Sequence, residues 1–252
     1  FVQPDGSIKN YEKEEYNIDH VNNGKLVLLL YRVTGKEKYK KAADQLRDQL
    51  RTHPRTKEGG FWHKKIYANQ MWLDGLYMGA SFYAEYAMLF HEDSAFNDVA
   101  NQFIWMEKHA RDPKSGLLYH AWDESKEQQW ANKTTGTSPL FWSRAMGWYA
   151  DALVDALDYF PASHPKRKDL INILNRLVNA IEKTQDKTTG LWYDIQLYNG
   201  PGKEKNYFEA SASSQFVYAV AKGVRKGYLP AAKITIAKKG YDGLVKQFIK
   251  EE

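Results

Sequence analysis

The sequence predicts an all-α fold of stacked helical hairpins, and three observations lead to this prediction. A short glycine pattern recurs four times, and each copy precedes a mostly apolar helical segment and then an amphipathic one. Regular repeats of this length are typical of supersecondary units that bury a shared core by stacking. The first helix of each pair is apolar almost all the way round, which indicates burial. A closed ring, with apolar helices inside and amphipathic helices outside, therefore fits better than an open solenoid.

The glycine pattern appears as "PDGSI", "KEGGFW", "PKSGLLY" and "KTTGLWY". In each copy a glycine precedes an apolar or aromatic pair, at Gly6, Gly60, Gly116 and Gly190. Glycine before such a pair marks a turn that leads into structured chain. Strand signals are few and confined to these loops, so we expect short extended pieces there, in the form of short hairpins.

The inner helices are expected at about 17–33, 69–91, 139–160 and 209–227. The second of them contains "YANQMWLDGLYMGASFYAEYAMLF", which is apolar on every face. Amphipathic outer helices are expected at about 37–52, 94–111, 166–185 and 231–249. The segment "YKKAADQLRDQL" is an example of the outer type. Its apolar side chains share one face of the helix, and they are Tyr39, Ala42, Ala43, Leu46 and Leu50.

The composition limits the possible functions. The chain has 252 residues, 43% of them hydrophobic and 14% aromatic, which is enough for one large domain with a sizeable core. It contains no cysteine, which excludes disulfides, thiolate nucleophiles and cysteine metal sites. The net charge is +5, but the lysines are scattered over amphipathic segments, so nucleic-acid binding is not predicted.

Targeting and cofactor motifs are also missing from the sequence. No stretch approaches the roughly 20 apolar residues of a membrane span. The first residues, "FVQPDGSIKN", lack a basic region followed by an apolar run, so we expect no signal peptide in this chain. "HEDSAF" is not a zinc-binding HExxH motif, and no phosphate-binding glycine run occurs. A polar loop at 124–138, in front of the third inner helix, is long enough to be functional.

Polar residues gather at one end of the inner helices. Parallel inner helices would bring their N-terminal ends to one mouth, and these ends carry Asp19, Asp74, Arg144, Ser211 and Ser213. The glycine loops open at the same mouth and add His63 in "GGFWHKK" and His120 in "LLYHAWDES". Titratable groups that converge in this way, with tryptophans beside them, indicate a pocket.

Each of these residues also has a purely structural interpretation. An aspartate early in a helix is most often a cap or interacts with the helix dipole, and this applies to Asp19 and Asp74. Loop histidines are usually solvated, and Trp142 and Trp148 could belong to the core. Arg144 is harder to explain in this way, because a guanidinium inside an apolar helix needs an anion.

Five motifs together resemble one family. They are "MWLDGLYMGASF", "GGFWHKK", "LLYHAWDES", "FWSRAMGWYADALVDALDYFP" and "EASASSQFVYAVAKGVRKGYL". Along the whole chain they are similar to the unsaturated rhamnogalacturonyl hydrolases of glycoside hydrolase family 105, relatives of the unsaturated glucuronyl hydrolases of family 88. The resemblance implies an (α/α)6 barrel of six hairpins. This chain would then be a single domain, residues 1–252, that holds four of them and lacks the family's N- and C-terminal ends.

The resemblance also implies a function. Asp74 matches the family's general acid/base, and Asp19 matches its second active-site aspartate. Other matching positions line the unsaturated sugar, with less definite roles for the two serines: His63, His120, Trp142, Arg144, Trp148, Ser211 and Ser213. Family substrates are lyase-generated oligosaccharides with a Δ4,5-unsaturated uronic acid at the non-reducing end, for example unsaturated rhamnogalacturonan disaccharide. The reaction hydrates the C4=C5 vinyl ether and needs no metal or organic cofactor.

Two alternatives remain open at this point. One is another (α/α)6 carbohydrate enzyme, such as an inverting glycosidase, a lyase or an epimerase. The other is a non-catalytic sugar-binding helical scaffold. The family implies a bacterial source, and the sequence does not decide between the cytoplasm and the periplasm as the compartment. The sequence leaves the neighbouring sugar and the oligomeric state undetermined.

Overall fold

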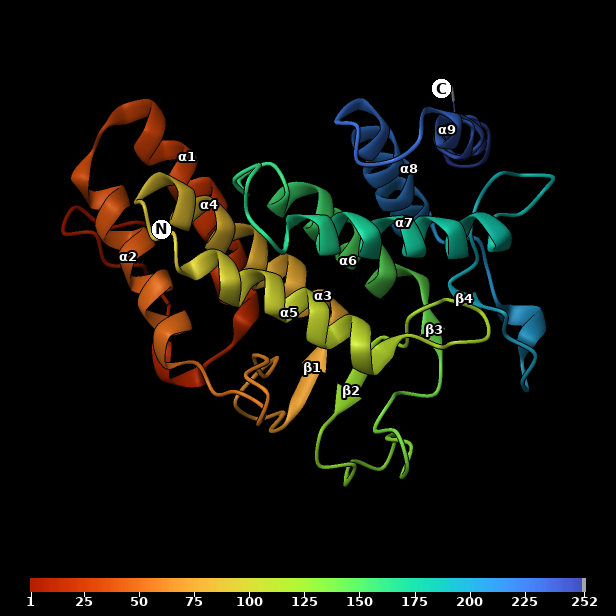
Figure 1. The fold of residues 1–252 in the computed structure, drawn as a ribbon, viewed down its shortest axis with the longest axis horizontal. Coiled ribbons are helices and arrows are strands. Elements are labelled where there is room, and N and C mark those ends of the chain that lie inside the picture. Colours follow the sequence, from red (N-terminus) through yellow and green to blue (C-terminus); the bar gives the residue numbers. More distant parts are fainter. Residues whose placement is uncertain (251–252) are drawn as a thin grey trace.

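The computed structural model describes residues 1–250, and the helices lie where the repeats predict them (Figure 1). The inner helices are α1 (Gly24–Thr34), α4 (Ser81–Leu89), α6 (Ser143–Ala156) and α8 (Ala210–Arg225). The outer helices are α2 (Glu37–Thr52), α5 (Ala95–Ala110), α7 (Arg167–Thr184) and α9 (Ile234–Phe248). The all-α prediction and the four hairpins are confirmed.

Two inner helices begin with irregular turns. A 3-10 helix, Ile18–Asn23, leads directly into α1. The short helix α3 (Leu73–Gly75) and a π-helical turn, Leu76–Ala80, lead into α4. Single π turns inside helices are often found at functional sites. The remaining short 3-10 helices are Lys13–Glu15, Lys203–Lys205 and Ala231–Lys233.

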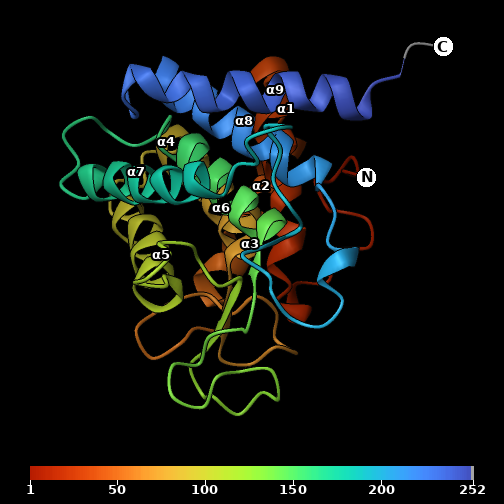
Figure 2. The ribbon, with the colours of Figure 1, turned by 90° about the vertical axis from the view of Figure 1, so that its right-hand side faces the viewer.

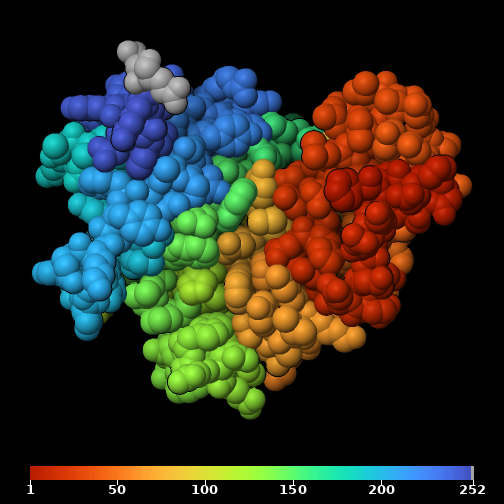
Figure 3. All heavy atoms as spheres, turned by 180° about the vertical axis from the view of Figure 1, so that it is seen from behind, coloured from red at the N-terminus to blue at the C-terminus, as the bar shows by residue number. Residues whose placement is uncertain are grey.

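The inner helices follow one another in a row, with α1 against α4, α4 against α6, and α6 against α8. Figures 1 and 2 show the outer helices along this row. Within residues 1–250 the row forms an open arc, so the prediction of a closed ring is wrong for this chain. Figure 3 shows the N-terminal part of the chain, in red, and its C-terminal helices, in blue, on opposite sides of the molecule. Apolar side chains are exposed at both ends of the arc, on α1 and on α9: Leu26, Leu29, Leu30, Val33, Tyr241, Val245 and Phe248.

Burial follows the predicted division between inner and outer helices. In α4 every residue from Ser81 to Ala87 is buried. In α2 the predicted stripe is buried at Ala42, Ala43, Leu46 and Leu50, while Tyr39 is half-buried. Each large apolar side chain removed from water contributes about 1.5–3 kcal/mol, so this core is the main source of stability.

The glycine loops share one backbone design. Each loop has one glycine with positive φ, and the carbonyl of this glycine accepts a hydrogen bond from a side-chain N–H group. The four pairs are Gly6 with Gln45, Gly59 with Arg55, Gly116 with Arg111, and Gly190 with Gln185. In the second loop the glycine with positive φ is Gly59, which precedes Gly60 of the sequence pattern. Gly59 has φ of 108°, which residues with a side chain rarely adopt.

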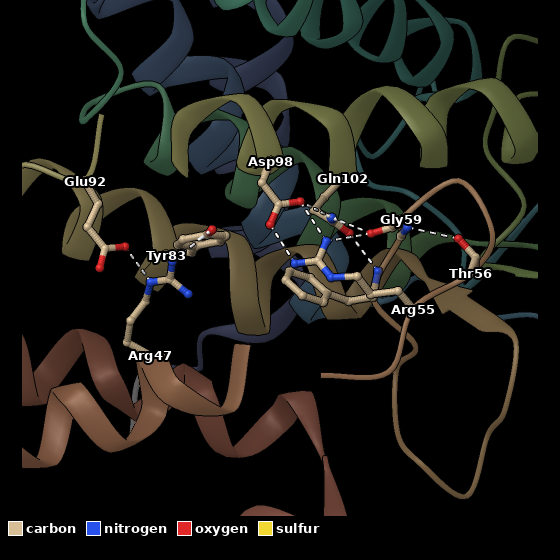
Figure 4. Close-up of polar contacts among 10 residues, drawn as sticks. Arg47, Arg55, Thr56, Gly59, Tyr83, Glu92, Asp98 and Gln102 are labelled. Carbon is tan, nitrogen blue, oxygen red and sulfur yellow. Dashed lines mark hydrogen bonds and ion pairs between the residues drawn. The ribbon is translucent and has the colours of Figure 1, made fainter. Parts of the chain in front are cut away.

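A polar network holds the second loop against α5 (Figure 4). The Arg55 guanidinium binds both carboxylate oxygens of Asp98, at 2.8 and 2.7 Å, and donates to the Gly59 carbonyl at 2.7 Å. Gln102 accepts from the Phe61 amide at 2.8 Å and donates to Gly59 at 3.1 Å. Because His63 comes two residues after Phe61, this network also helps to fix the position of the His63 backbone.

The extended segments lie just before the inner helices. Strand β1 (Gln70–Trp72) pairs antiparallel with β2 (Ala121–Asp123), and β3 (Phe141–Trp142) pairs with β4 (Ile195–Gln196). Short strands were predicted, but these pairs join successive repeats, whereas the glycine loops themselves have only isolated bridges. Both sheets lie on the side of the arc where the inner helices begin (Figure 1).

Candidate functional site

Asp74 lies in the first turn of α3, directly after strand β1. Its Oδ2 atom is buried and has no hydrogen-bond partner. Burial is the main cause that raises the pKa of Asp74 to about 6, and the Asp19 carboxylate also raises this pKa. A hydrogen bond from the backbone amide of Asp74 and the charge of the Arg144 guanidinium both lower it. The charges of Asp19 and Arg144, from two other repeats, thus act on this carboxyl.

Two glycines bring the helix start close to its neighbours. A Cβ atom on Gly75 would lie 3.1 Å from Nδ1 of His63, and one on Gly79 would lie 2.8 Å from the Ile18 side chain. The π turn and these glycines therefore place the Asp74 segment close against the His63 loop.

Asp19 lies beside a histidine and a lysine. Its Oδ1 atom is 3.4 Å from Nε2 of His63, and its Oδ2 atom is 2.9 Å from Nζ of Lys64. The Asn17 Oδ1 atom accepts a hydrogen bond of 3.0 Å from the Asp19 backbone amide, and this bond fixes the turn. Burial lowers the pKa of His63 to about 4, although the Asp19 charge opposes the shift. The sequence interpretation missed Lys64, even though it follows His63 directly in "GGFWHKK".

Aromatic rings form one wall of the site. Trp72 stacks on both His63 and Tyr67, with centroid distances of 4.6 and 5.1 Å and interplanar angles of 5° and 9°. The His120 ring meets Trp72 and Trp142 edge-on, at 6.1 and 6.0 Å. Burial also lowers the pKa of His120. Both histidines therefore present neutral rings at neutral pH.

Trp72 was missed, although the sequence contains a signal for it. "WLD" and "WSR" place a tryptophan two residues before Asp74 and two residues before Arg144. Both tryptophans end a short strand that precedes an inner helix. Trp142 is held further by its Nε1 atom, which donates to Asp194 at 2.9 Å.

Arg144 lies in the first turn of α6, with its guanidinium 5.3 Å from the ring centroid of Trp142. Its Nη2 atom donates to Oε1 of Glu209 at 3.0 Å. Nε of Arg144 is buried without a partner. Glu209, which the sequence interpretation missed, caps α8 and accepts hydrogen bonds from the Ser211 hydroxyl and the Ala212 amide.

Three predicted site residues lie differently from the rest. Ser211 reaches the site through Glu209. Ser213 is completely buried, and its hydroxyl accepts from the Trp192 amide at 3.2 Å, so it braces the neighbouring loop. Trp148 lies one turn below Arg144 on α6, where its half-buried ring packs on Tyr77 at 4.6 Å. The other predicted residues meet at the mouth: Asp19, His63, Asp74, His120, Trp142 and Arg144.

Two features are absent from residues 1–250, the part of the chain that the structure describes. No group of three or more histidine, aspartate or glutamate side chains in this part of the chain is placed to hold a metal ion. None of the described helices is long and apolar enough to cross a membrane.

Comparisons with known proteins agree with the resemblance. The model of Glycosyl Hydrolase Family 88 matches residues 3–252. A solved structure of a family 105 glycoside hydrolase from C. acetobutylicum ATCC 824 is 53% identical, with a TM-score of 0.96, and the match covers 100% of this chain and 69% of that one. An Agrobacterium fabrum protein is 38% identical over 152 residues, 60% of this chain and 63% of its own length.

A third match carries a functional name. Unsaturated rhamnogalacturonyl hydrolase YesR of Bacillus subtilis (strain 168) is 29% identical over 210 residues, 81% of this chain and 57% of YesR. The chain thus spans less than two thirds of these two curated relatives. Since the family model matches almost every residue and a family 105 structure is 53% identical, the chain belongs to Glycosyl Hydrolase Family 88 and to the related glycoside hydrolase family 105.

Proposed function

We propose that the protein releases the Δ4,5-unsaturated uronic acid from the non-reducing end of lyase-generated oligosaccharides. The observation that carries this proposal is the Asp74 carboxyl, whose Oδ2 atom is buried without a partner and whose pKa burial raises to about 6. A carboxyl with such a pKa can hold a proton close to neutral pH and can also take one back. Family membership and the name of YesR favour unsaturated rhamnogalacturonan disaccharide as the substrate.

The chemistry requires one proton donor and one water molecule. The ring oxygen makes C4=C5 of the sugar a vinyl ether. Asp74 protonates C4, positive charge develops at C5 and the ring oxygen, and the oxygen of water bonds to C5. The proton that this water loses returns to the Asp74 carboxylate. The resulting hemiketal opens, and the glycosidic bond breaks with it, so one water is consumed overall.

The surrounding groups suit an anionic, planar sugar. The Arg144 guanidinium, on a side chain that is 40% exposed, can donate to the uronate carboxylate, an arrangement in which arginine is especially effective. The neutral rings of His63 and His120 can donate to or accept from sugar hydroxyls without adding charge. Trp72 and Trp142 supply apolar ring faces.

The position of Asp19 favours this mechanism over ordinary glycoside hydrolysis. An inverting or retaining glycosidase needs two carboxyl groups on opposite sides of the scissile bond. Here Asp19 is bound by Lys64 and lies beside His63. We therefore assign Asp19 to orienting the sugar and raising the pKa of Asp74, while Asp74 serves as both acid and base.

The test is to incubate the protein with unsaturated rhamnogalacturonan disaccharide and follow the ultraviolet absorbance of C4=C5. The expected result is a loss of absorbance together with release of the neutral sugar. The saturated disaccharide is the control, and it should remain intact. Cleavage of the saturated compound at a similar rate would indicate an ordinary glycosidase. An increase in absorbance on longer polysaccharide would indicate a lyase, and binding without any reaction would indicate a sugar-binding scaffold.

A further inference from the structure

Glu209 is a carboxylate whose position is fixed from several sides. Its side chain is only 7% exposed. Oε1 accepts from Nη2 of Arg144 at 3.0 Å and from the Ser211 hydroxyl at 2.9 Å. Oε2 accepts from the same hydroxyl at 2.8 Å and from the Ala212 amide at the start of α8. A buried carboxylate with this many donors has little freedom to move, so it is a rigid anchor for Arg144.

Arg144 uses only part of its binding capacity on this anchor. The guanidinium is a planar fork with five N–H donors, and a carboxylate often takes two of them. Arg55 shows the complete arrangement, because it binds both oxygens of Asp98. Arg144 instead contacts one oxygen of Glu209 through Nη2, and its Nε remains buried without a partner. The Arg144 side chain is 40% exposed, so a ligand can approach it from the mouth.

We propose that Glu209 is a positioning residue that holds the Arg144 guanidinium by Nη2, so that its remaining exposed N–H donors are presented to the carboxylate of the substrate. This inference rests on the proposed function, because it assigns how the uronate group is recognised. Glu209 itself does not touch the sugar. Its buried charge also keeps Arg144 from being an uncompensated cation before the substrate binds.

The interaction with the helix end offers a competing explanation, in which Glu209 serves only as the N-cap of α8. The two explanations differ in what Glu209→Gln should change. The glutamine oxygen can still accept from the Ala212 amide, while its NH2 group then faces the Arg144 donors. A cap role therefore predicts little change in substrate affinity, whereas a positioning role predicts a clear loss.

A matched control exists on a neighbouring helix. Glu85 in α4 is also a buried carboxylate, 6% exposed, and it binds Arg32, 48% exposed, at 3.2 Å. It lies at the other end of the inner helix from Asp74. Glu85→Gln therefore removes the same kind of buried pair without altering the mouth, and any general cost of breaking such a pair will appear in this variant.

The experiment measures KM and kcat for the unsaturated disaccharide in the wild type, Glu209→Gln, Glu85→Gln, Arg144→Met and the double variant Arg144→Met/Glu209→Gln. We expect Glu209→Gln to raise KM about 10–100-fold, the loss typical of a charged hydrogen bond, with a smaller change in kcat. Glu85→Gln should leave KM unchanged. In the Arg144→Met background, Glu209→Gln should add nothing further to KM, because Glu209 acts through Arg144.

Three results would overturn the inference: an unchanged KM for Glu209→Gln, an equal effect of Glu85→Gln, or a full additional effect in the Arg144→Met background. If Glu209→Gln does not fold, Glu209→Asp keeps a good N-cap and withdraws the carboxylate by one methylene from Arg144. If the wild type does not turn over the disaccharide, the proposed function fails by itself. The Kd of glucuronate, measured by calorimetry in the same variants, then decides the role of Glu209 with the same expected ratios.

Discussion

The Nε2 atom of His63 lies 3.4 Å from Oδ1 of Asp19, yet the two do not form an ion pair at neutral pH. Burial lowers the pKa of His63 to about 4, so the imidazole is uncharged there. Lys64, at 2.9 Å, supplies the positive charge beside Asp19 instead. The Asp19 carboxylate therefore acts on Asp74 as an anion with a single cationic neighbour, which is one reason why the pKa of Asp74 is raised.

The first prediction concerns the charge of His63. Because its pKa lies near 4, the imidazole should not titrate between pH 5 and 8. The ring resonances of His63, assigned by comparison with His63→Gln, should keep the neutral chemical shifts over this range in NMR spectra. A titration midpoint close to 6.5, the ordinary value for histidine, would contradict the burial argument.

The second prediction concerns the pH dependence of turnover. Asp74 must be protonated to donate to C4, and its pKa is about 6. In the pH range above about 6, kcat/KM should therefore fall, approaching tenfold per pH unit. Removing the Asp19 charge should lower the pKa of Asp74, so the falling limb in Asp19→Asn should move to lower pH. If the falling limb of the Asp19→Asn profile stays at the wild-type pH, the Asp19 charge does not raise the pKa of Asp74.

The third prediction concerns stability. The pKa of Asp74 is higher in the folded state than in the unfolded state, where it is about 3.8. Its contribution to stability is therefore fully present below pH 3.8 and is lost as the pH rises through about 6. At pH 8 the wild type keeps an unpartnered buried anion, and Asp74→Asn should be more stable by about 1–2 kcal/mol.

Denaturant titrations at pH 4 and pH 8 would test this difference. The advantage of Asp74→Asn should shrink towards pH 4, where wild-type Asp74 is largely protonated. The control is Asp242→Asn, a substitution of an exposed residue on α9, which should show no such pH-dependent gain. If Asp74→Asn is less stable than the wild type at pH 8, the carboxylate has a favourable partner after all.

The helices could be predicted from the sequence because burial leaves a direct mark on it. The apolar segment around Phe82 and the stripe through Leu46 and Leu50 became the inner and outer helices in the way that their periodicity indicates. The open arc was not predicted, because an apolar helix gives the same signal whether its partner belongs to this chain or not. The π turn at Leu76–Ala80 leaves no composition signal either.

The mouth was predicted more completely than the contacts within it. Asp19, Asp74 and Arg144 could be placed together because each begins an inner helix. Glu209 and Lys64 were missed because their importance depends on which atoms they bind, and this comes from the pairing of elements far apart in sequence. Ser213 shows the opposite case, since its position in a motif gives no information about the direction of its hydroxyl.

The fourth prediction concerns the loop that leads to His63. Gly59 has φ of 108°, and a Cβ atom there would lie 2.7 Å from the Trp105 ring. Gly59→Ala should therefore lower the melting temperature clearly, by backbone strain of about 1–3 kcal/mol together with the clash. Gly35→Ala is the matched control, because φ is 65° and nothing lies within 4 Å of its added Cβ. Equal losses in the two variants would show that the contact with Trp105 is unimportant.

The last prediction concerns the chemical step itself. Asp74→Asn is nearly isosteric, so substrate binding should persist, but an amide cannot donate and recover the proton. Turnover should fall about 10²–10⁴-fold, the usual range for loss of a general acid–base group. Asp19→Asn should reduce turnover less, since in the proposed mechanism Asp19 orients the sugar and tunes Asp74. The measurement is single-turnover loss of C4=C5 absorbance, with the binding of substrate to each variant measured separately. An Asp74→Asn protein that hydrates the sugar at nearly the wild-type rate would exclude Asp74 as the proton donor, and Asp19, which lies beside His63, would then become the leading candidate for the acid.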